Sequence, residues 1–148
     1  KNAENQNLAK EHENKIWELW LSSGSSKINN NKMEKGVKLM QSGKLDEALQ
    51  LFINLSESDP NWAEPINKIA TIRYIQGDLY GSIRDIQLTL KLEPRHFGAI
   101  AGLAQINLAL GRYKETLRNL DFAIDIYPFI GIKNLKPIVL DLIKKSQV

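Results

Sequence analysis

Side chains that could carry out chemistry are few in this chain, and they lie far apart. The chain has two histidines, His12 and His96, and no cysteine. Neither histidine has another histidine three or four residues away, the spacing at which one helix offers two imidazoles to a metal ion. We therefore predict no metal site. Because no nucleophile motif accompanies His96, we expect it to cap or pack a helix junction and not to act as a base.

Glycines and carboxylates give no stronger sign of catalysis. Gly98 and Gly102 are four residues apart, which on a helix indicates close packing of a neighbouring helix. A phosphate-binding loop would end in Gly-Lys-Ser/Thr, and that ending is missing. Four aspartates are expected on solvated helix faces: Asp78, Asp85, Asp121 and Asp125. Nothing indicates a carboxylate pair for glycoside hydrolysis. The sequence thus predicts no enzyme, no catalytic residue and no cofactor.

Composition describes a globular chain with balanced charge. Its 148 residues are 43% hydrophobic, and 20 basic residues against 17 acidic ones give a net charge of +3. Because the two signs are interleaved along the chain, we expect no nucleic-acid partner. No apolar run reaches the roughly eighteen residues that a spanning helix needs, so we expect no membrane insertion. The chain begins with Lys1, and we expect that a signal peptide, a tag or a longer N-terminus preceded it.

The elements that must position these side chains follow an internal repeat. Gly43, Gly77 and Gly111 are each 34 residues apart, and Pro60, Pro94 and Pro128 repeat at the same distance. Apolar residues at helical spacing lie between each glycine and the next proline: Leu45, Ala48, Leu49, Phe52 and Leu55, then Leu79, Ile83, Ile86 and Leu90, then Tyr113, Leu117, Leu120 and Ile124. The pattern predicts one amphipathic helix in each copy.

This period, with the spacing of Gly36, Gly43, Leu45, Ala48 and Pro60, resembles the tetratricopeptide repeat (TPR). The resemblance implies an all-α, right-handed helical solenoid of helix–turn–helix units. Each unit has a first helix and a second helix, with the glycine between them. Ser82 and Thr116 stand where the family often has alanine, a departure that we expect to affect packing detail and not the fold.

The resemblance covers residues 29–130 and divides the chain. Residues 1–30 form an N-terminal helix and a Ser/Asn-rich loop, and the repeats follow within residues 31–130, at about 29–62, 63–96 and 97–130. Within the first repeat, the first helix is expected from about Asn31, after a loop from Ser22. Residues 131–148 are expected to form a capping helix with one apolar stripe, made of Leu135, Ile138, Val139, Leu142 and Ile143.

Aromatic area is concentrated near the N-terminus. Trp17 and Trp20 lie in the segment IWELWL, which has too much apolar surface to remain in water. We favour the hypothesis that this segment caps the exposed end of the first repeat. The alternative is a hook that binds a partner.

The family geometry implies a binding groove lined by the first helix of each repeat. Its expected residues are Met33, Val37, Met40, Asn67, Thr71, Tyr74, Ala101, Gln105 and Leu108. This mixture of apolar and hydrogen-bonding groups suits a peptide or helix of a partner protein. The alternative is that the N- or C-terminal helix of the same chain fills the groove. Some TPR domains clamp the C-terminal carboxylate of heat-shock chaperones, but Met33, Val37 and Gly102 stand in those places and cannot hold an anion.

Two functions remain open at this stage. The first is a non-enzymatic interaction module, or scaffold, that binds a protein or peptide in its groove. The second is an assembly subunit that joins a complex or self-associates through its convex face or its Trp-bearing segment. IWELW and LEPRHFGAIAGLA also resemble small exported TPR proteins of Gram-negative bacteria, which implies a periplasmic location, with the cytoplasm as the alternative.

Overall fold

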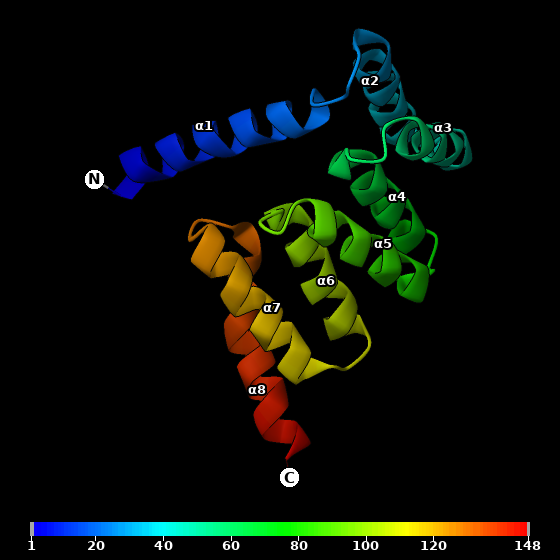
Figure 1. The fold of residues 1–148 in the computed structure, drawn as a ribbon. Helices are drawn as coiled ribbons and strands as arrows, with labels where there is room; N and C mark the ends of the chain where they lie inside the picture. Colours follow the sequence, from blue (N-terminus) through cyan, green and yellow to red (C-terminus); the bar gives the residue numbers. More distant parts are fainter. Residues whose placement is uncertain (1, 148) are drawn as a thin grey trace. The chain divides into compact units, whose positions relative to one another are not determined.

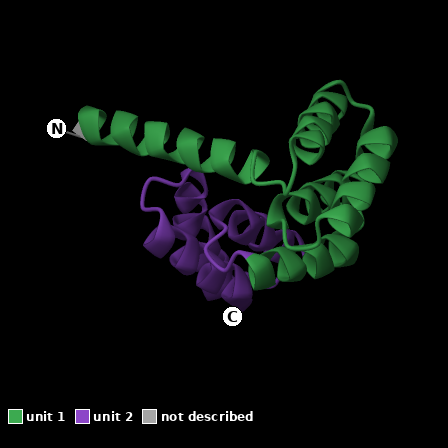
Figure 2. Ribbon diagram, turned by 45° about the horizontal axis from the view of Figure 1, so that its top comes forward, with its two compact units in different colours: residues 1–92 green, residues 93–148 purple. Residues whose placement is uncertain are grey.

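The computed structural model describes residues 2–147, and all the regular secondary structure in that range is helical (Figure 1). The helices are α1 (Asn2–Leu21), α2 (Lys27–Gln41), α3 (Leu45–Ser58), α4 (Ala63–Ile75), α5 (Leu79–Leu92), α6 (Phe97–Ala109), α7 (Tyr113–Ile126), the 3-10 helix η1 (Gly131–Leu135) and α8 (Lys136–Ser146). The chain forms two compact units, residues 1–92 and 93–148 (Figure 2). The all-α prediction is confirmed.

The turn between the two helices of each repeat is the same in all three copies. Gly43, Gly77 and Gly111 have φ values of 77°, 85° and 70°, a conformation that costs glycine little and other residues more. The residue after each glycine donates its N–H to a carbonyl five residues earlier, as in a Schellman motif. These bonds are Lys44 to Leu39, Asp78 to Arg73, and Arg112 to Asn107. The repeated glycine therefore ends each first helix and reverses the chain.

Small residues let the two helices of a repeat approach closely. A Cβ on Gly36 would lie 2.5 Å from the ring of Phe52, so the ring of α3 occupies the space that a larger residue on α2 would need. Ala70 and Ala104 take the equivalent places 34 and 68 residues later, and both are buried. The α4·α5 and α6·α7 pairs thus repeat the α2·α3 pair.

The two departures from alanine in the second helices are accommodated by hydrogen bonds. Ser82 and Thr116 are fully buried, but their hydroxyls are satisfied. Ser82 donates to the carbonyl of Ala70 at 2.7 Å, which ties α5 to α4, and Thr116 donates to the carbonyl of Arg112 at 2.9 Å. A buried hydroxyl with a partner costs little, which is why the helix pairing survives these changes.

Each unit has its own apolar core. In residues 1–92, the core comprises Met33, Ala48, Phe52, Leu55, Trp62, Ile69 and Ile72. In residues 93–148, α8 places Val139 against Ala104 and Leu120, with Leu135 and Ile143 packed around them. The C-terminal helix therefore covers the last repeat, as predicted. Ile138, which was expected in the apolar stripe of this helix, is 54% exposed instead and does not belong to this core.

Two details differ from the sequence analysis. Helix α2 begins at Lys27 and not at Asn31, because the Ser26 side chain accepts the N–H of Asn29 and starts the helix four residues earlier. Asp85 is buried and not solvated, since it accepts a hydrogen bond from Arg73 at 2.9 Å across the α4·α5 pair. Burial raises the pKa of Asp85 above its ordinary value, and the charge of Arg73 offsets only part of that effect.

The role of α8 can be tested with adjacent residues. Val139→Asp places a carboxylate in the core of residues 93–148, whereas Ile138→Asp places one at an exposed site. We expect Val139→Asp to lower the free energy of unfolding by about 3 kcal/mol, from lost burial and an unpaired buried charge. Thermal melts followed by circular dichroism would measure both. Equal melting temperatures for the two variants would show that α8 does not cap the repeat.

Candidate functional site

The nine residues expected to line a groove all lie on the first helices of the repeats. Helix α2 carries Met33, Val37 and Met40, helix α4 carries Asn67, Thr71 and Tyr74, and helix α6 carries Ala101, Gln105 and Leu108. Helices α2 and α4 belong to the unit of residues 1–92, and α6 to the other unit. The helix assignments match the expected ones, but the side chains differ in how far they are exposed.

The three side chains of α2 lie in or against the core. Met33 is completely buried, and Val37 and Met40 are half-buried beside the same cluster. Met33 therefore stabilises the α2·α3·α4 core and offers no surface to a ligand in this structure. Val37 and Met40 keep part of their apolar surface accessible.

Helix α4 presents the most accessible part of the set. Asn67 is only 6% exposed, and its amide donates to Glu64 at 3.3 Å. Thr71 is exposed and donates its hydroxyl to the carbonyl of Asn67 at 3.0 Å. Tyr74, one turn further along, is 39% exposed. The second half of α4 thus exposes the aromatic ring of Tyr74 and the side chain of Thr71, whereas Asn67 is buried and forms its hydrogen bond inside the unit.

The residues of α6 are a mixed group. Gln105 is exposed and Ala101 is partly so. Leu108 packs against the core formed by Ala104, Leu120 and Val139. Within residues 93–148, Gln105 is therefore the most accessible hydrogen-bonding group among the three.

Sequence reasoning missed two residues that lie beside this face of α4. Lys68 forms an ion pair with the buried Glu64 at 3.2 Å, and its Nζ lies 5.3 Å from the centre of the Trp17 ring. A cation placed over an indole ring is attracted by the ring's negative face. The spacing of Glu64 and Lys68, i and i+4 on a predicted helix, was the available sequence signal. Trp17 could not have been placed there from sequence.

The tryptophans of α1 lie against the junction of the first two repeats. Trp17 and Trp20 meet edge to face with ring centres 5.1 Å apart, and Trp62 donates its indole N–H to the carbonyl of Trp20 at 2.6 Å. Both rings are half-buried. The aromatic segment therefore packs on its own chain, as the capping hypothesis required, but it reaches the start of α4 as well as the first repeat.

The loop before α2 is held by a buried carboxylate. Asp59 accepts hydrogen bonds from the N–H of Ser25 and from the side chain of Asn29. Burial raises the pKa of Asp59, but the bonds from Ser25 and Asn29 outweigh it and hold that pKa below its ordinary value of 3.8. This site fixes the end of the α1–α2 loop to the end of α3.

Two of the side chains considered for catalysis, His96 and Asp78, have structural roles. His96 is completely buried and begins α6, where its Nδ1 accepts the N–H of Ala99 at 3.1 Å. Asp78 accepts the N–H of Gly81 at 2.8 Å and so caps α5. Within residues 2–147 no group of three histidine, cysteine or carboxylate side chains could hold a metal ion. In the same range, no helix is long and apolar enough to cross a membrane.

Comparison with known proteins gives one relative in sequence and several in structure. No family model matches the chain. A TPR repeat-containing protein of Rhizobium etli is 35% identical over 115 residues, which are 78% of this chain and 56% of that protein. The chain thus spans little more than half the length of this relative.

Solved structures show the same fold at lower identity. The first TPR domain of Spaghetti (RPAP3), bound to an HSP90 peptide, has a TM-score of 0.76 and 18% identity, covering 82% of this chain and 97% of that one. The Sgt2 TPR domain of Aspergillus fumigatus has a TM-score of 0.75 and 15% identity, with 85% of each chain covered. The Yersinia enterocolitica secretion chaperone SycD, in complex with a YopD peptide, has a TM-score of 0.70 and 18% identity over 83% of this chain and 95% of its own.

Replacing Trp62 should loosen α1. Trp62→Phe keeps an aromatic ring in the core but removes the hydrogen bond to Trp20. We expect amide hydrogen exchange in residues 17–21 to become roughly five times faster, because a bond worth about 1 kcal/mol holds this end of the helix. Exchange in α7 serves as the internal control. Unchanged exchange in residues 17–21 would show that the bond does not hold α1.

The acid sensitivity of the loop should depend on Asp59. Because its pKa is lowered in the folded protein, Asp59 stabilises the fold above its unfolded value of 3.8 and loses that contribution as the pH falls below it. Asp59→Asn should therefore lower the free energy of unfolding at neutral pH. The variant should also lose less of that free energy than the wild type between about pH 5 and pH 3. Urea unfolding at several pH values would measure this. Parallel curves for the variant and the wild type would contradict it.

Proposed function

Because the chain belongs to the tetratricopeptide-repeat family, we propose that it is a non-enzymatic interaction module that binds a peptide or helix of another protein along the exposed face of α4. The observation that carries this proposal is Tyr74, a partly exposed aromatic side chain on a first helix. Thr71 supplies a hydroxyl one turn before it. The partner is a protein or peptide.

Tyr74 has the properties of a binding anchor. Aromatic side chains that become buried on binding carry much of the energy of protein interfaces, while polar neighbours fix the register. Ile75, also on α4, is 56% exposed and adds apolar area. Val37 and Met40 of α2, in the same unit, keep part of their surface accessible. Together these side chains form an apolar area on α2 and α4 that a ligand would cover, which supports this face as the site.

The neighbours in structure support the class of ligand. Spaghetti is bound to an HSP90 peptide and SycD to a YopD peptide, so proteins of this fold bind peptides. The present chain differs at the places of the heat-shock carboxylate clamp, where Met33, Val37 and Gly102 stand. We therefore propose an internal segment or a helix as the ligand, bound through apolar contacts, and not a chain end bound through its carboxylate.

Helix α1 limits the site at one end. The Trp17 ring and the Glu64–Lys68 ion pair cover the first half of α4. We therefore place the ligand on the second half, from Thr71 to Ile75.

For the location of the protein we retain the periplasm as the proposal, supported by the IWELW and LEPRHFGAIAGLA segments, with the cytoplasm as the alternative.

A matched pair of tyrosines tests the site. Peptides selected from a random display library on the intact chain should bind Tyr74→Ala at least about tenfold more weakly, because truncating a central aromatic anchor typically costs 2 kcal/mol or so. Tyr80→Ala removes another exposed tyrosine of the same unit, on α5, and should leave affinity unchanged. Fluorescence anisotropy with the selected peptides would measure both variants.

The stability of the variants shows whether the α4 face is free to bind a partner or is occupied by a segment of the same chain. Because Tyr74 is exposed, its truncation should leave the melting temperature nearly unchanged. Peptides that depend on Tyr80 and not on Tyr74 would exclude the α4 face as the main site. A sharp drop in stability without ligand would show that a segment of the chain itself occupies this face.

A further inference from the structure

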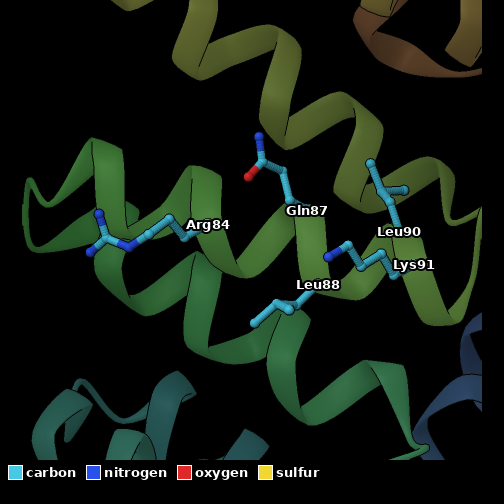
Figure 3. A pocket seen from close by; sticks show the side chains of 5 residues that line it. All are labelled: Arg84, Gln87, Leu88, Leu90 and Lys91. Atoms are coloured by element: carbon cyan, nitrogen blue, oxygen red, sulfur yellow. The ribbon is translucent and has the colours of Figure 1, made fainter.

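Helix α5 has an exposed stripe that the proposed α4 site does not use. It consists of Arg84, Leu88 one turn later, and the adjacent Lys91 and Leu92 after one more turn. Leu88 is 47% exposed and Leu92 38%, and both basic side chains are exposed. Figure 3 shows Leu88 between Arg84 and Lys91, all three at a surface pocket that Gln87 and Leu90 also line. We call this set the α5 stripe.

The repeat itself provides a comparison for the α5 stripe. The same four positions in α3, 34 residues earlier, hold Gln50, Asn54, Glu57 and Ser58. They are all polar, so the helix pairing of a repeat does not need apolar or basic side chains there. In α7 the positions hold Arg118, Phe122, Asp125 and Ile126, and Arg118 is paired with Glu115. The combination of two basic and two apolar residues is therefore particular to α5.

The two basic side chains of the α5 stripe, Arg84 and Lys91, form no ion pair within residues 2–147. The carboxylate of α5, Asp85, is buried and already bound to Arg73. Burial raises the pKa of Asp85, and the charges of Arg73 and Arg84 offset part of that effect. At the exposed surface of this helix, however, no carboxylate in the described part of the chain forms an ion pair with Arg84 or Lys91.

We propose that the α5 stripe is a second docking surface, and that it binds an acidic amphipathic helix of a partner protein. Arg84 and Lys91 are seven residues apart, about 10.5 Å along the axis. Two carboxylates one heptad apart on a partner helix match this distance, and apolar residues between them would cover Leu88. Charge complementarity of this kind selects the partner and sets its orientation, while Leu88 and Leu92 supply the buried area.

Two helical peptides test the proposal. One has a leucine face flanked by two glutamates a heptad apart, and its twin has lysines at those two positions. Labelled with fluorescein and titrated with the intact chain at low salt, the glutamate peptide should bind and the lysine peptide should bind at least about tenfold more weakly. Equal affinities, or no binding of the glutamate peptide, would overturn the proposal.

Variants in two repeats locate the binding. Arg84→Glu and Leu88→Ser should each weaken the glutamate peptide about five- to tenfold, through charge reversal and lost burial. Gln50→Glu and Asn54→Ser introduce the same two side chains at the matching positions of α3 and should have no effect. Because Leu88, Gln50 and Asn54 are exposed, the variants at these three positions should keep the melting temperature of the wild type. Equal effects in the two repeats would contradict the assignment.

Two further experiments distinguish binding at the α5 stripe from binding at the α4 site and from binding to a lipid surface. Tyr74→Ala should leave the glutamate peptide bound, so that failure of the α4 site and failure of the α5 stripe are distinguishable. Vesicles of anionic and neutral phospholipid, tested in the same way, should not bind in an Arg84-dependent manner. If they do, while the glutamate peptide does not bind, the stripe contacts a lipid surface and the proposal is wrong.

Discussion

The close approach of the two helices in each repeat is the constraint on which the rest of the structure depends. A small residue at positions 36, 70 and 104 permits it, and at Gly36 the ring of Phe52 occupies the space of the missing Cβ. The glycine turn seven residues later returns the chain at the right distance for this contact. Once these pairs form, the outward faces of α4 and α5 are fixed by helical periodicity, and the candidate surfaces follow.

A second contact between paired helices differs in every repeat. Arg73 donates to Asp85 in the second repeat, and Asn107 donates to Asn119 in the third. The matching positions of the first repeat hold Leu39 and Leu51. The ion pair and the amide pair each satisfy groups that would be costly to bury alone. We infer that these unlike pairs favour the correct partner over the equivalent helix of another repeat, because Arg73 opposite Leu51 would lose its carboxylate.

Much of the fold was predictable because it rests on local chemistry. The glycines, the prolines and the apolar spacing predicted one helix between each glycine and the next proline, and α3, α5 and α7 lie in those three places. The start of α2 was missed, since the Ser26 cap lies inside a run of serines and asparagines in which many residues could begin a helix. Asp85 was misplaced for a different reason. An aspartate on a helix is usually solvated, and only the position of Arg73 on α4 explains its burial.

The candidate site was predictable in outline only. The resemblance to the repeat family indicated which faces of α2 and α4 would line a groove, but not how deeply each side chain is buried. The structure buries Met33 and Asn67 and exposes Tyr74. The contact of Trp17 with Lys68 joins residues about fifty places apart in the chain, and no repeat period predicts it. Long-range contacts of this kind depend on where α1 packs, which the IWELW segment alone does not specify.

The most direct test of the account is a map of the bound surface by nuclear magnetic resonance. The intact chain, labelled with nitrogen-15, would be titrated with a peptide selected on it, and the amide shifts followed residue by residue. The account predicts that the largest changes fall in α4 from Thr71 to Ile75, with smaller ones at Val37 and Met40 of α2. Changes confined to α1, α3 or α8, with α4 unaffected, would contradict it.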